Sequence, residues 1–366
     1  MTTPIPAIIM TPPADLSRAE QWMARGRRAA ALDLVSLLCS HEAIDPVYVL
    51  AADDQDGQAL SQAGGVLLQG AKGEFHFGQA LARIVDQAEL EHMAYFGGAS
   101  APLLNDQLLH QAVALLLADS QPRAVVNNRH STDWALLNHA PMLAKLTERL
   151  PADNPLGWVL EREAGFDVHA LDACAATRFD LDTPADFVLL LDHPQIGNRM
   201  RDFLSNVPGI LKQRVDALRQ VLTSEGNTLI VIGRSSSDVW AQLERRAQIW
   251  VRMFVEERGM TASGRLARGE VRSLLAELLE EVGPEVFVEE LSSLGDAVLW
   301  DTRVWMAHRG GFPSSADRFA ADLGWEDEID DARLRRLTRV VNQAAIPILT
   351  GGHGVVSGGV YALLER

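Results

Sequence analysis

The first half of the chain alternates short apolar runs with longer segments of helical periodicity. The apolar runs are bounded by glycine, proline or polar residues, and their length suits buried strands. They are Ala7–Met10, Pro46–Ala51, Gly65–Leu68, His92–Phe96 and Arg123–Val126. The segments between them have the apolar spacing of helices packed on a sheet, and they are Arg27–Cys39, Gln55–Gln62, Phe77–Ala88 and Asp106–Ala118. This order predicts an α/β fold with a mostly parallel sheet and helices on both faces.

The pattern changes in the second half. Residues 192–226 are largely helical in pattern, with Val215, Leu218 and Leu222 spaced for one buried stripe. A new strand-like run, Thr228–Ile232, follows. We therefore predict a first domain at residues 1–195, a helical connector at 196–226, and a second, smaller α/β or α-rich domain at 227–366.

Composition narrows the class of protein. The chain has 366 residues, of which 47% are apolar and 22% are charged, and its formal charge is −16. This composition is typical of a globular protein with a large core. A nucleic-acid partner is not expected, because that role needs a basic face. Small anionic ligands remain compatible with the charge, since one local pocket can be positive on an acidic protein.

The two cysteines, Cys39 and Cys174, stand in apolar or small-residue surroundings. They predict buried thiols in a reducing compartment rather than a disulfide. The sequence shows neither a leader-like N-terminus nor an apolar run long enough for a membrane span, so we expect a cytoplasmic protein without membrane contact. The ten histidines show no zinc spacing with either cysteine, and there is no Gly-x-Ser-x-Gly elbow.

Polar loops follow three of the predicted strands. In a parallel sheet the ligand crevice lies at the carboxyl ends of the strands. The three loops are Thr11–Asp15, Gly97–Leu104 with its hydroxyl at Ser100, and Asn127–Trp134. The last loop has seven hydrogen-bonding side chains in eight positions, so it is either an ordinary polar turn or part of a binding site.

The segment Arg178–Phe187 places three carboxylates around a Thr-Pro turn. If the backbone is extended, Asp180 and Asp182 point to one side, and two oxygen donors side by side suit Mg²⁺. The alternative is structural. In that case Asp182 caps a helix that starts at the Thr-Pro turn, and Asp186 faces its positive end.

These segments together resemble the nucleotidyltransferases of the glycosyltransferase-A type, especially the 2-phospholactate guanylyltransferase and molybdenum-cofactor nucleotidyltransferase group. The resemblance covers residues 5–192. Such proteins have a carboxylate-containing turn before Pro-Leu-Leu, a polar loop for the acceptor, and a closing Asp-x-Asp-Thr-Pro-x-Asp motif. The closing motif matches in full, and the other matches are partial: Gly64–Ala88, Gly98–Leu104 and Asn128–Leu137.

Two departures from the family pattern concern the nucleotide. Such enzymes usually begin with a Gly-rich loop whose bare N–H groups hold phosphates. Here that loop contains Thr11, Pro12 and Pro13, and the two prolines remove two donors. Ser100 stands where the family carries an Asp ligand, so a cation held by Ser100 with Asp180 or Asp182 would be bound more weakly than by paired carboxylates.

Three arginines in the first helix bear on the same question. Arg25, Arg27 and Arg28 either reach a phosphate or form a solvated basic helix face.

The resemblance implies attack by an acceptor oxygen on the α-phosphate of a nucleoside triphosphate, with pyrophosphate leaving. Asp182 or Asp180 would be the catalytic carboxylate that holds Mg²⁺, with Ser100 assisting. Nucleotide contacts are expected from Thr11, Arg27, Gly97, Gly98 and Ser100, and acceptor contacts from Asn127, Asn128, Ser131 and Asp133. Two alternatives stay open: a non-catalytic ligand-binding or regulatory relative, and a glycosyltransferase that uses a nucleotide sugar.

The second half carries chemistry of its own. The loop Gly233–Asp238 follows a strand and opens a helix, which is the order of an anion site, although Ser237 or Asp238 as a plain helix cap is the simpler interpretation. Asp296–His308 is predicted as a buried strand in which Asp301 and Arg303 either pair or face a cavity. His353 lies in a glycine-rich turn, where it is either structural or a phosphate or acid–base contact.

Tryptophans concentrate in the second half, at positions 240, 250, 300, 305 and 325. They predict core packing or an interface, and the latter would make the protein a homo-oligomer.

Overall fold

The computed structural model describes residues 4–13, 17–70 and 74–365, and the chain forms two compact units. Unit 1 comprises Met1–Ala14, Arg27–Asp180 and Gln195–Met200. Unit 2 comprises Asp15–Gly26, Leu181–Pro194 and Arg201–Arg366. Residues 181–194, which we assigned to the first domain, and residues 201–226, which we assigned to a connector, thus belong to unit 2.

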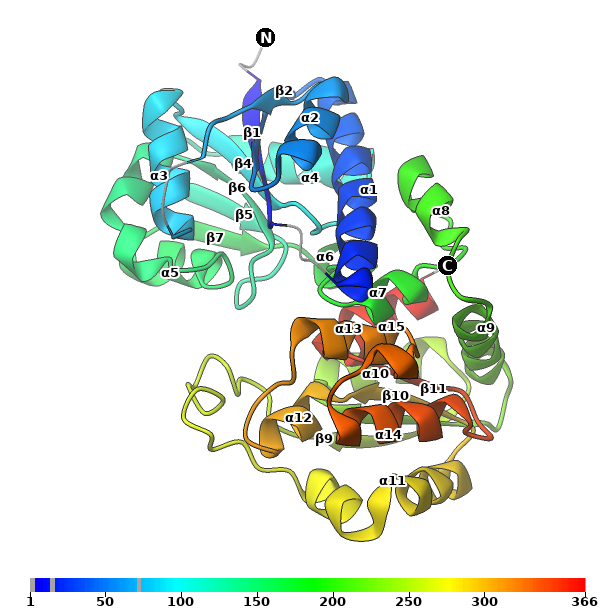
Figure 1. Cartoon of the computed structure of the whole chain (residues 1–366). Coiled ribbons are helices and arrows are strands. Elements are labelled where there is room, and N and C mark those ends of the chain that lie inside the picture. Colours follow the sequence, from blue (N-terminus) through cyan, green and yellow to red (C-terminus); the bar gives the residue numbers. More distant parts are fainter. Residues whose placement is uncertain (1–3, 14–16, 71–73, 366) are drawn as a thin grey trace. The chain divides into compact units, whose positions relative to one another are not determined.

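Unit 1 is built on a seven-stranded sheet in the order β3-β2-β1-β4-β6-β5-β7 (Figure 1). The strands are β1 (Ile5–Thr11), β2 (Ile44–Ala51), β3 (Val66–Leu67), β4 (His92–Gly97), β5 (Arg123–Val126), β6 (Trp134–Asn138) and β7 (Asp167–Ala170). Only β6 pairs antiparallel with its neighbours among the described strands. The α/β fold with a mostly parallel sheet is therefore confirmed.

Helices cover both faces of this sheet. They are α1 (Arg18–Ser40), α2 (Asp54–Gln62), α3 (Phe77–Gln87), α4 (Asp106–Leu117), α5 (Leu156–Glu163) and α6 (Ala175–Arg178). Alternate residues of β1 enter two cores, as strand geometry requires. Ile8 and Met10 pack with residues of α3 and α5, whereas Ala7 and Ile9 pack with residues of α1 and α4.

The predicted strands of the first half match β1 to β5 closely, and three of the predicted helices match α2, α3 and α4. α1 begins at Arg18, nine residues before the predicted start at Arg27, and β6, β7, α5 and α6 were not predicted. β6 begins directly after a polar loop, so its apolar run was interpreted as part of that loop. β7 is too short and too polar to be recognised as a buried strand from its sequence. The antiparallel β6 returns from β5 as the second arm of a hairpin and so ends the parallel order.

Unit 2 contains a parallel four-stranded sheet in the order β11-β10-β8-β9. Its strands are β8 (Thr228–Gly233), β9 (Trp250–Val255), β10 (Ala297–Asp301) and β11 (Ile348–Gly351). The helices are α7 (Pro184–Leu189), α9 (Gly209–Thr223), α10 (Ser237–Arg246), α11 (Leu274–Leu294), α12 (Arg303–His308), α13 (Ser315–Asp322), α14 (Ala332–Asn342) and α15 (Gly358–Leu364). The short helix α8 (Asn198–Leu204) contains residues of both units.

The second half is therefore α/β, one of the two classes predicted for it. α9 packs on β8, β10 and β11 as part of unit 2. The predicted strand Asp296–His308 is wrong beyond Asp301. The strand ends there and Arg303 begins α12, because Thr302 takes up helical backbone angles.

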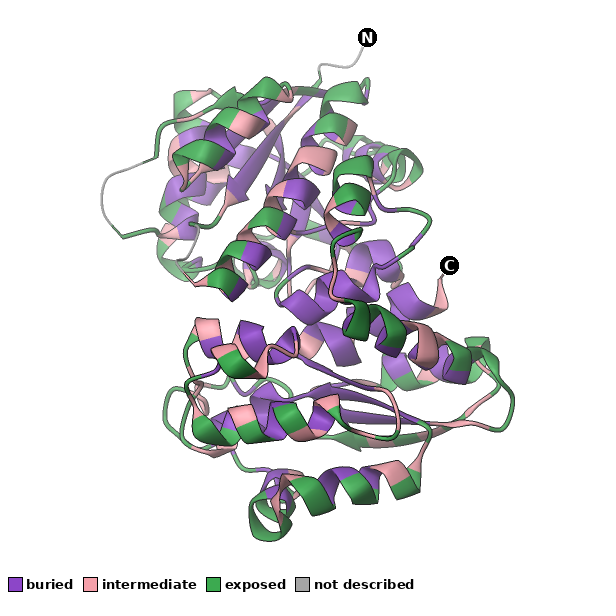
Figure 2. Cartoon of the chain, turned by 45° about the vertical axis from the view of Figure 1, so that its right-hand side comes forward, coloured by how far each residue is buried: buried purple, intermediate pink, exposed green. Residues whose placement is uncertain are grey.

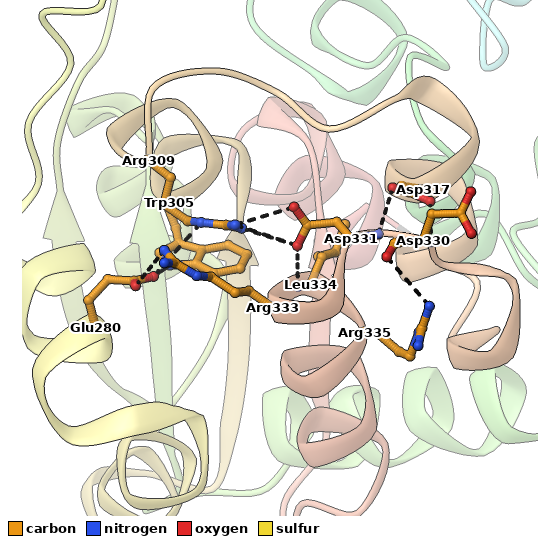
Figure 3. A network of polar contacts seen from close by, with 9 residues as sticks. All are labelled: Glu280, Trp305, Arg309, Asp317, Asp330, Asp331, Arg333, Leu334 and Arg335. Atoms are coloured by element: carbon orange, nitrogen blue, oxygen red, sulfur yellow. Dashed lines mark hydrogen bonds and ion pairs between the residues drawn. The ribbon is translucent and has the colours of Figure 1, made fainter.

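A polar network joins α11, α12, α13 and α14 (Figure 3). Asp331 caps α14 and pairs with Arg309 at 3.2 Å. The Trp305 indole N–H donates to Glu280 at 2.8 Å, and Asp317 accepts the backbone N–H of Asp331 at 3.1 Å. Polar and charged contacts therefore help to hold these four helices of unit 2 together, in addition to apolar packing.

Burial follows the layers: most strands are buried and most helices expose one side, whereas α7 is buried throughout and β9 is largely exposed (Figure 2). Trp300 and Trp305 are buried, whereas Trp240 and Trp250 are exposed. Both cysteines are free thiols, but the prediction that both are buried is wrong: Cys39 is exposed at the end of α1, and Cys174 is half-buried. None of the helices in the described part of the chain is both long and apolar enough to span a bilayer.

Candidate functional site

The sheet of unit 1 has a topological switch point between β1 and β4. From β1 the chain continues to β2 on one side, whereas β4 pairs with β1 on the other. Ligands of open α/β sheets bind outside the carboxyl ends of the strands at such a point. The loops that begin at Thr11 and at Gly97 lie at this edge, since Met10 is in register with Gly97.

Gly98 brings these two loops together. Its N–H donates to the Met10 carbonyl at 2.7 Å. A Cβ at Gly98 would lie 2.6 Å from the Thr11 side chain and 2.9 Å from the Met10 carbonyl oxygen. The glycine is therefore required for strand-end packing. The Thr11 hydroxyl is buried beside it without a hydrogen-bond partner.

The Ser100 side chain forms a hydrogen bond within the same turn. Its hydroxyl donates to the Gly97 carbonyl at 2.7 Å, and the residue is buried. The hydroxyl proton thus stabilises the turn, and only the oxygen lone pairs are left for a cation.

Asn127 is a structural residue of the loop between β5 and β6. Its amide group donates to Asp133 Oδ2 at 2.8 Å and to the Thr177 carbonyl at 3.2 Å. Its carbonyl oxygen accepts the backbone N–H groups of Asp133 and Trp134. Both donors and both lone pairs are used, so this side chain has no capacity left for the acceptor contact we predicted.

The other predicted acceptor residues hold the loop together and lie at the same edge. Asn128 accepts the His130 N–H at 3.2 Å, and Ser131 donates to Asn154 at 3.0 Å. The Asp133 carbonyl accepts the Gly97 N–H at 3.0 Å. The loops after β4 and β5 are therefore joined at one edge of the sheet.

The sequence analysis missed two residues beside Asp133. The Tyr95 hydroxyl donates to Asp153 at 2.8 Å. Burial, together with the Asp153 and Asp133 carboxylates, raises the pKa of Tyr95 well above its ordinary value. Tyr95 stood inside an apolar run, and Asp153 lies far from the matched motifs. The only available signal was a hydroxyl next to the end of a predicted strand.

Arg178 is a third residue to which we gave no role. Its guanidinium donates to the backbone carbonyl of Asn127 at 3.5 Å, which places a cation at the end of β5. Asp180 follows two residues later in unit 1 and is only partly exposed. Arg178 was the first residue of the carboxylate segment, but its position at the sheet edge depends on the return of α6 to β5.

The arginines of α1 differ in their partners. Arg28 forms an ion pair with Asp56 and donates to Gln55 at 3.1 Å. Arg27 is partly exposed in unit 1, and Arg25 is exposed in unit 2. Arg28 is thus occupied within unit 1, and a phosphate contact from Arg27 stays a prediction.

The Thr-Pro turn caps α7, but not through Asp182. Thr183 is the N-cap, and its N–H and hydroxyl both donate to Asp186 Oδ2, at 2.7 and 2.9 Å. This is a capping box with an acid at the third helical position. Proline is favoured at the first position of a helix, and α7 starts at Pro184. Thr183 is therefore the capping residue, and Asp182 precedes it.

The division into units separates the predicted metal ligands. Asp180 and Ser100 belong to unit 1, whereas Asp182 belongs to unit 2. Within the described residues no three His, Cys, Asp or Glu side chains are grouped to hold a metal ion. This does not conflict with Mg²⁺, which one or two carboxylates and substrate phosphates commonly hold. The Mg²⁺ site stays a prediction.

Asp186 is completely buried, and its Oδ1 atom has no hydrogen-bond partner. Burial and the nearby Asp182 carboxylate raise the pKa of Asp186 to about 8. The carboxyl group is therefore protonated at neutral pH. Three carboxylates in one motif thus have different roles, and one of them is not an anion.

No protein-family model matches this sequence, and no curated protein matches it significantly. Several solved structures share part of the architecture. A cytidylyltransferase from Leptospira borgpetersenii serovar Hardjo-bovis is 15% identical over 52% of this chain and 85% of its own, with a TM-score of 0.42.

Two further structures match similar portions. A protein from Desulfovibrio desulfuricans G20, described as a nucleotide-diphospho-sugar transferase, is 13% identical over 57% of this chain and 97% of its own, with a TM-score of 0.42. A 4-diphosphocytidyl-2C-methyl-D-erythritol synthase from Anaerococcus prevotii is 13% identical over 46% of this chain and 86% of its own, with a TM-score of 0.33. At such identities and scores we base the function on the side chains of the site.

Proposed function

We propose that unit 1 binds a nucleotide at the switch point between β1 and β4 and transfers it from a nucleoside triphosphate to a small acceptor. The observation that carries this proposal is the joined polar edge at the carboxyl ends of β1, β4 and β5. Three loops meet there through backbone hydrogen bonds, and the edge carries Arg178 and Asp133; Asp180 follows Arg178 by two positions along the chain. Open α/β sheets bind their ligands at such an edge.

The side chains at this edge fit the demands of phosphoryl chemistry. Nucleotidyl transfer depends mainly on positioning and on neutralising charge. Arg178 would donate to phosphate oxygens, and Asp133 or Asn128 would orient the acceptor hydroxyl or phosphate. The oxygen-rich set of donors fits a hard cation, and Asp180 is the unit 1 carboxylate that we assign to Mg²⁺. Bound Mg²⁺ would neutralise charge on the phosphates.

The second candidate is a nucleotide-binding protein without turnover. The hydroxyl of Ser100 and the side-chain amide of Asn127 favour this candidate, because both groups already make hydrogen bonds within unit 1 and are not available to a substrate as donors. Pro12 and Pro13 also remove two donors from the loop after β1.

A binding experiment on the full chain tests the first proposal. Thermal unfolding and calorimetric titration would be followed with the four common nucleoside triphosphates and with nucleotide sugars, with and without Mg²⁺. A ligand that binds only the folded state raises the midpoint by mass action. We expect a Mg²⁺-dependent rise with a triphosphate. A response to nucleotide sugars alone would instead favour the glycosyltransferase, and no response to any nucleotide would contradict both candidates.

Variants locate the site. Arg178→Gln should weaken triphosphate binding about tenfold or more, since a hydrogen bond to a charged group contributes roughly 1.5–3 kcal/mol. Asp180→Asn should abolish the gain that Mg²⁺ gives. Arg162→Gln and Glu148→Gln are controls, because both side chains are exposed in unit 1. Pyrophosphate release then separates transfer from binding, and equal affinity in Arg178→Gln and the controls would reject this edge.

A further inference from the structure

The sheet of unit 2 has a switch point of its own, between β8 and β10. From β8 the chain continues to β9 on one side, while β10 pairs with β8 on the other. The crevice of this sheet is therefore expected where the loops after β8 and β10 diverge. Arg234 follows β8, Asp301 ends β10, and His353 follows β11. The topology thus brings together residues that the sequence presented as separate features.

Arg234 and Asp301 form a two-point ion pair at this switch point. Arg234 Nε donates to Asp301 Oδ2 at 2.5 Å, and Nη2 donates to Oδ1 at 3.2 Å. The Asp301 side chain is completely buried, whereas that of Arg234 is 17% exposed. The pair fixes the plane of the guanidinium and uses one of its edges. The Nη1 edge faces away from Asp301 and can donate to another oxyanion.

One of our alternatives was an ion pair between Asp301 and Arg303. The two side chains do not form this pair. The Arg303 guanidinium forms its own buried pair with Asp322, at 2.6 and 2.8 Å. Only the backbone N–H of Arg303 donates to Asp301, at 3.2 Å. Each buried carboxylate thus has its own arginine, and Arg234 is the arginine of the two that reaches solvent.

His353 lies close to this pair. Its Nδ1 atom is buried and has no hydrogen-bond partner among the residues that the structure describes. Burial and the neighbouring Arg234 lower the pKa of His353, with a smaller contribution from Arg258, while Asp301 and Asp182 oppose the shift. The imidazole is therefore neutral at pH 7. An anion bound beside His353 and Arg234 would raise this pKa.

The loop after β8 also opens α10 at this edge. Ser236 is the N-cap, rather than Ser237 or Asp238, and its hydroxyl accepts the Val239 N–H. The first turn of the helix leaves backbone N–H groups at its positive end, which favours anions. The Ser235 hydroxyl donates to the Val356 carbonyl at 2.7 Å. This bond ties the Arg234 loop to the short helix η4 (His353–Val356), which begins with the histidine.

Carboxylates nearby are mostly matched. Glu257 pairs with Arg265 at 2.6 Å, and Glu256 accepts the Ser273 hydroxyl at 2.8 Å. Burial raises the pKa of Glu256. Asp301 balances the charge of Arg234, and Asp182 is a second carboxylate that acts on His353, so an anion here would be held by directed N–H groups rather than by excess positive charge.

We propose that the switch point of unit 2 binds a phosphate group through the Arg234 guanidinium, His353 and the N-terminus of α10. Asp301 is a positioning residue that orients the arginine. A guanidinium fork, an imidazole and backbone N–H groups together match the several oxygens of a phosphate. The residues of this site all belong to unit 2, and the inference does not depend on the function proposed for unit 1.

Titration of the full chain with inorganic phosphate and with pyrophosphate tests the proposal. Arg234→Lys keeps the charge but loses the planar fork, so affinity should fall about tenfold. His353→Gln should lower affinity by about threefold or more. It also covers the case in which changes at Arg234 unfold unit 2, because the Nδ1 atom makes no hydrogen bond that would be lost. Arg245→Gln, on the exposed side of α10, is the control and should leave affinity unchanged.

Two further measurements make the result specific. NMR titration of the histidines, with His353→Gln as the assignment, should show the pKa of His353 rising when sulfate or phosphate is added. Sulfate keeps its charge over this pH range, so the shift cannot come from titration of the ligand. An equal response to acetate would show a carboxylate site instead and would overturn the choice of phosphate.

The unit 1 variant Arg178→Gln distinguishes the two sites. If phosphate binding is lost in Arg178→Gln and retained in both Arg234→Lys and His353→Gln, phosphate binds only unit 1 and the inference is wrong. It is equally wrong if no saturable binding occurs up to roughly 10 mM phosphate, a range that covers weak complexes. Loss in the unit 2 variants with retention in Arg178→Gln and Arg245→Gln supports it.

Discussion

At the scale of single residues, the most informative side chain is Asp186. One alternative placed it at the positive end of a helix, and it does lie in the first turn of α7, but as a buried carboxyl group with a pKa of about 8. Its Oδ2 atom accepts two hydrogen bonds from Thr183, whereas Oδ1 has none. Sequence alone does not reveal this, because the shift comes from burial by segments far away in the chain.

This protonation has a measurable consequence for stability. The folded-state pKa of Asp186 is raised above the ordinary 3.8, so the folded protein holds a proton that the unfolded chain has lost. Stability should therefore fall as the pH rises from about 4 to about 8, by a few kcal/mol at most. Asp186→Asn should flatten this dependence and be more stable than the wild type at about pH 9.

Denaturant unfolding at several pH values measures the effect. Asp202→Asn, an exposed change in unit 2, should keep the wild-type pH dependence. A loss of stability in Asp186→Asn that is equal at pH 6 and pH 9 would show that the carboxylate is ionised in the folded state.

At the scale of elements, the glycine-rich turn after β11 packs against α7. The sequence placed His353 in this turn without showing why the turn is rich in glycine. A Cβ at Gly354 would lie 2.2 Å from Asp186 Oδ1. The turn therefore carries glycine at this position because a helix lies against it, and His353 at its start is held in place by that packing.

Gly354→Ala should destabilise unit 2 by about 1–3 kcal/mol, because the added methyl group overpacks a buried contact. The matched control is Gly209→Ala at the start of α9, where a Cβ would meet nothing within 4 Å. That change should be neutral or stabilising by up to roughly 1 kcal/mol, since alanine restricts the unfolded chain. Thermal or denaturant unfolding of both variants measures the difference, and equal stability would rule out the packing role.

At the scale of the whole molecule, charge is the dominant property. The chain carries −16, and its exposed ion pairs, such as Arg336–Glu285 at 2.6 Å, each contribute little in water. Repulsion among the excess carboxylates opposes the compact state. The prediction of a homo-oligomer stays a prediction at this scale, as does the cytoplasmic location.

Raising NaCl from about 0.02 to about 0.2 M should therefore raise the midpoint of thermal unfolding by a few degrees, because salt screens the repulsion. Calorimetry at fixed pH, in a buffer without phosphate or sulfate, measures this. A midpoint that falls with salt would mean that ion pairs stabilise the protein more than repulsion destabilises it.

The sequence by itself determined the α/β class, the extents of most strands and helices in the first half, and the positions of polar loops at strand ends. These features follow from local periodicity and from residues that break it, which act over a few positions. The missed strands β6 and β7 were too short or too polar for periodicity to show them.

Only the tertiary structure decided which side chains meet. In the structure Arg234 pairs with Asp301, and Arg303 pairs with Asp322. The side chain of Asn127 is fully hydrogen-bonded, and the N-cap of α7 is Thr183 rather than Asp182. Ion pairs and burial join residues tens of positions apart, and their partners depend on how the layers pack. The same dependence brings Arg234, Asp301 and His353 to one sheet edge, which no spacing along the chain could have predicted.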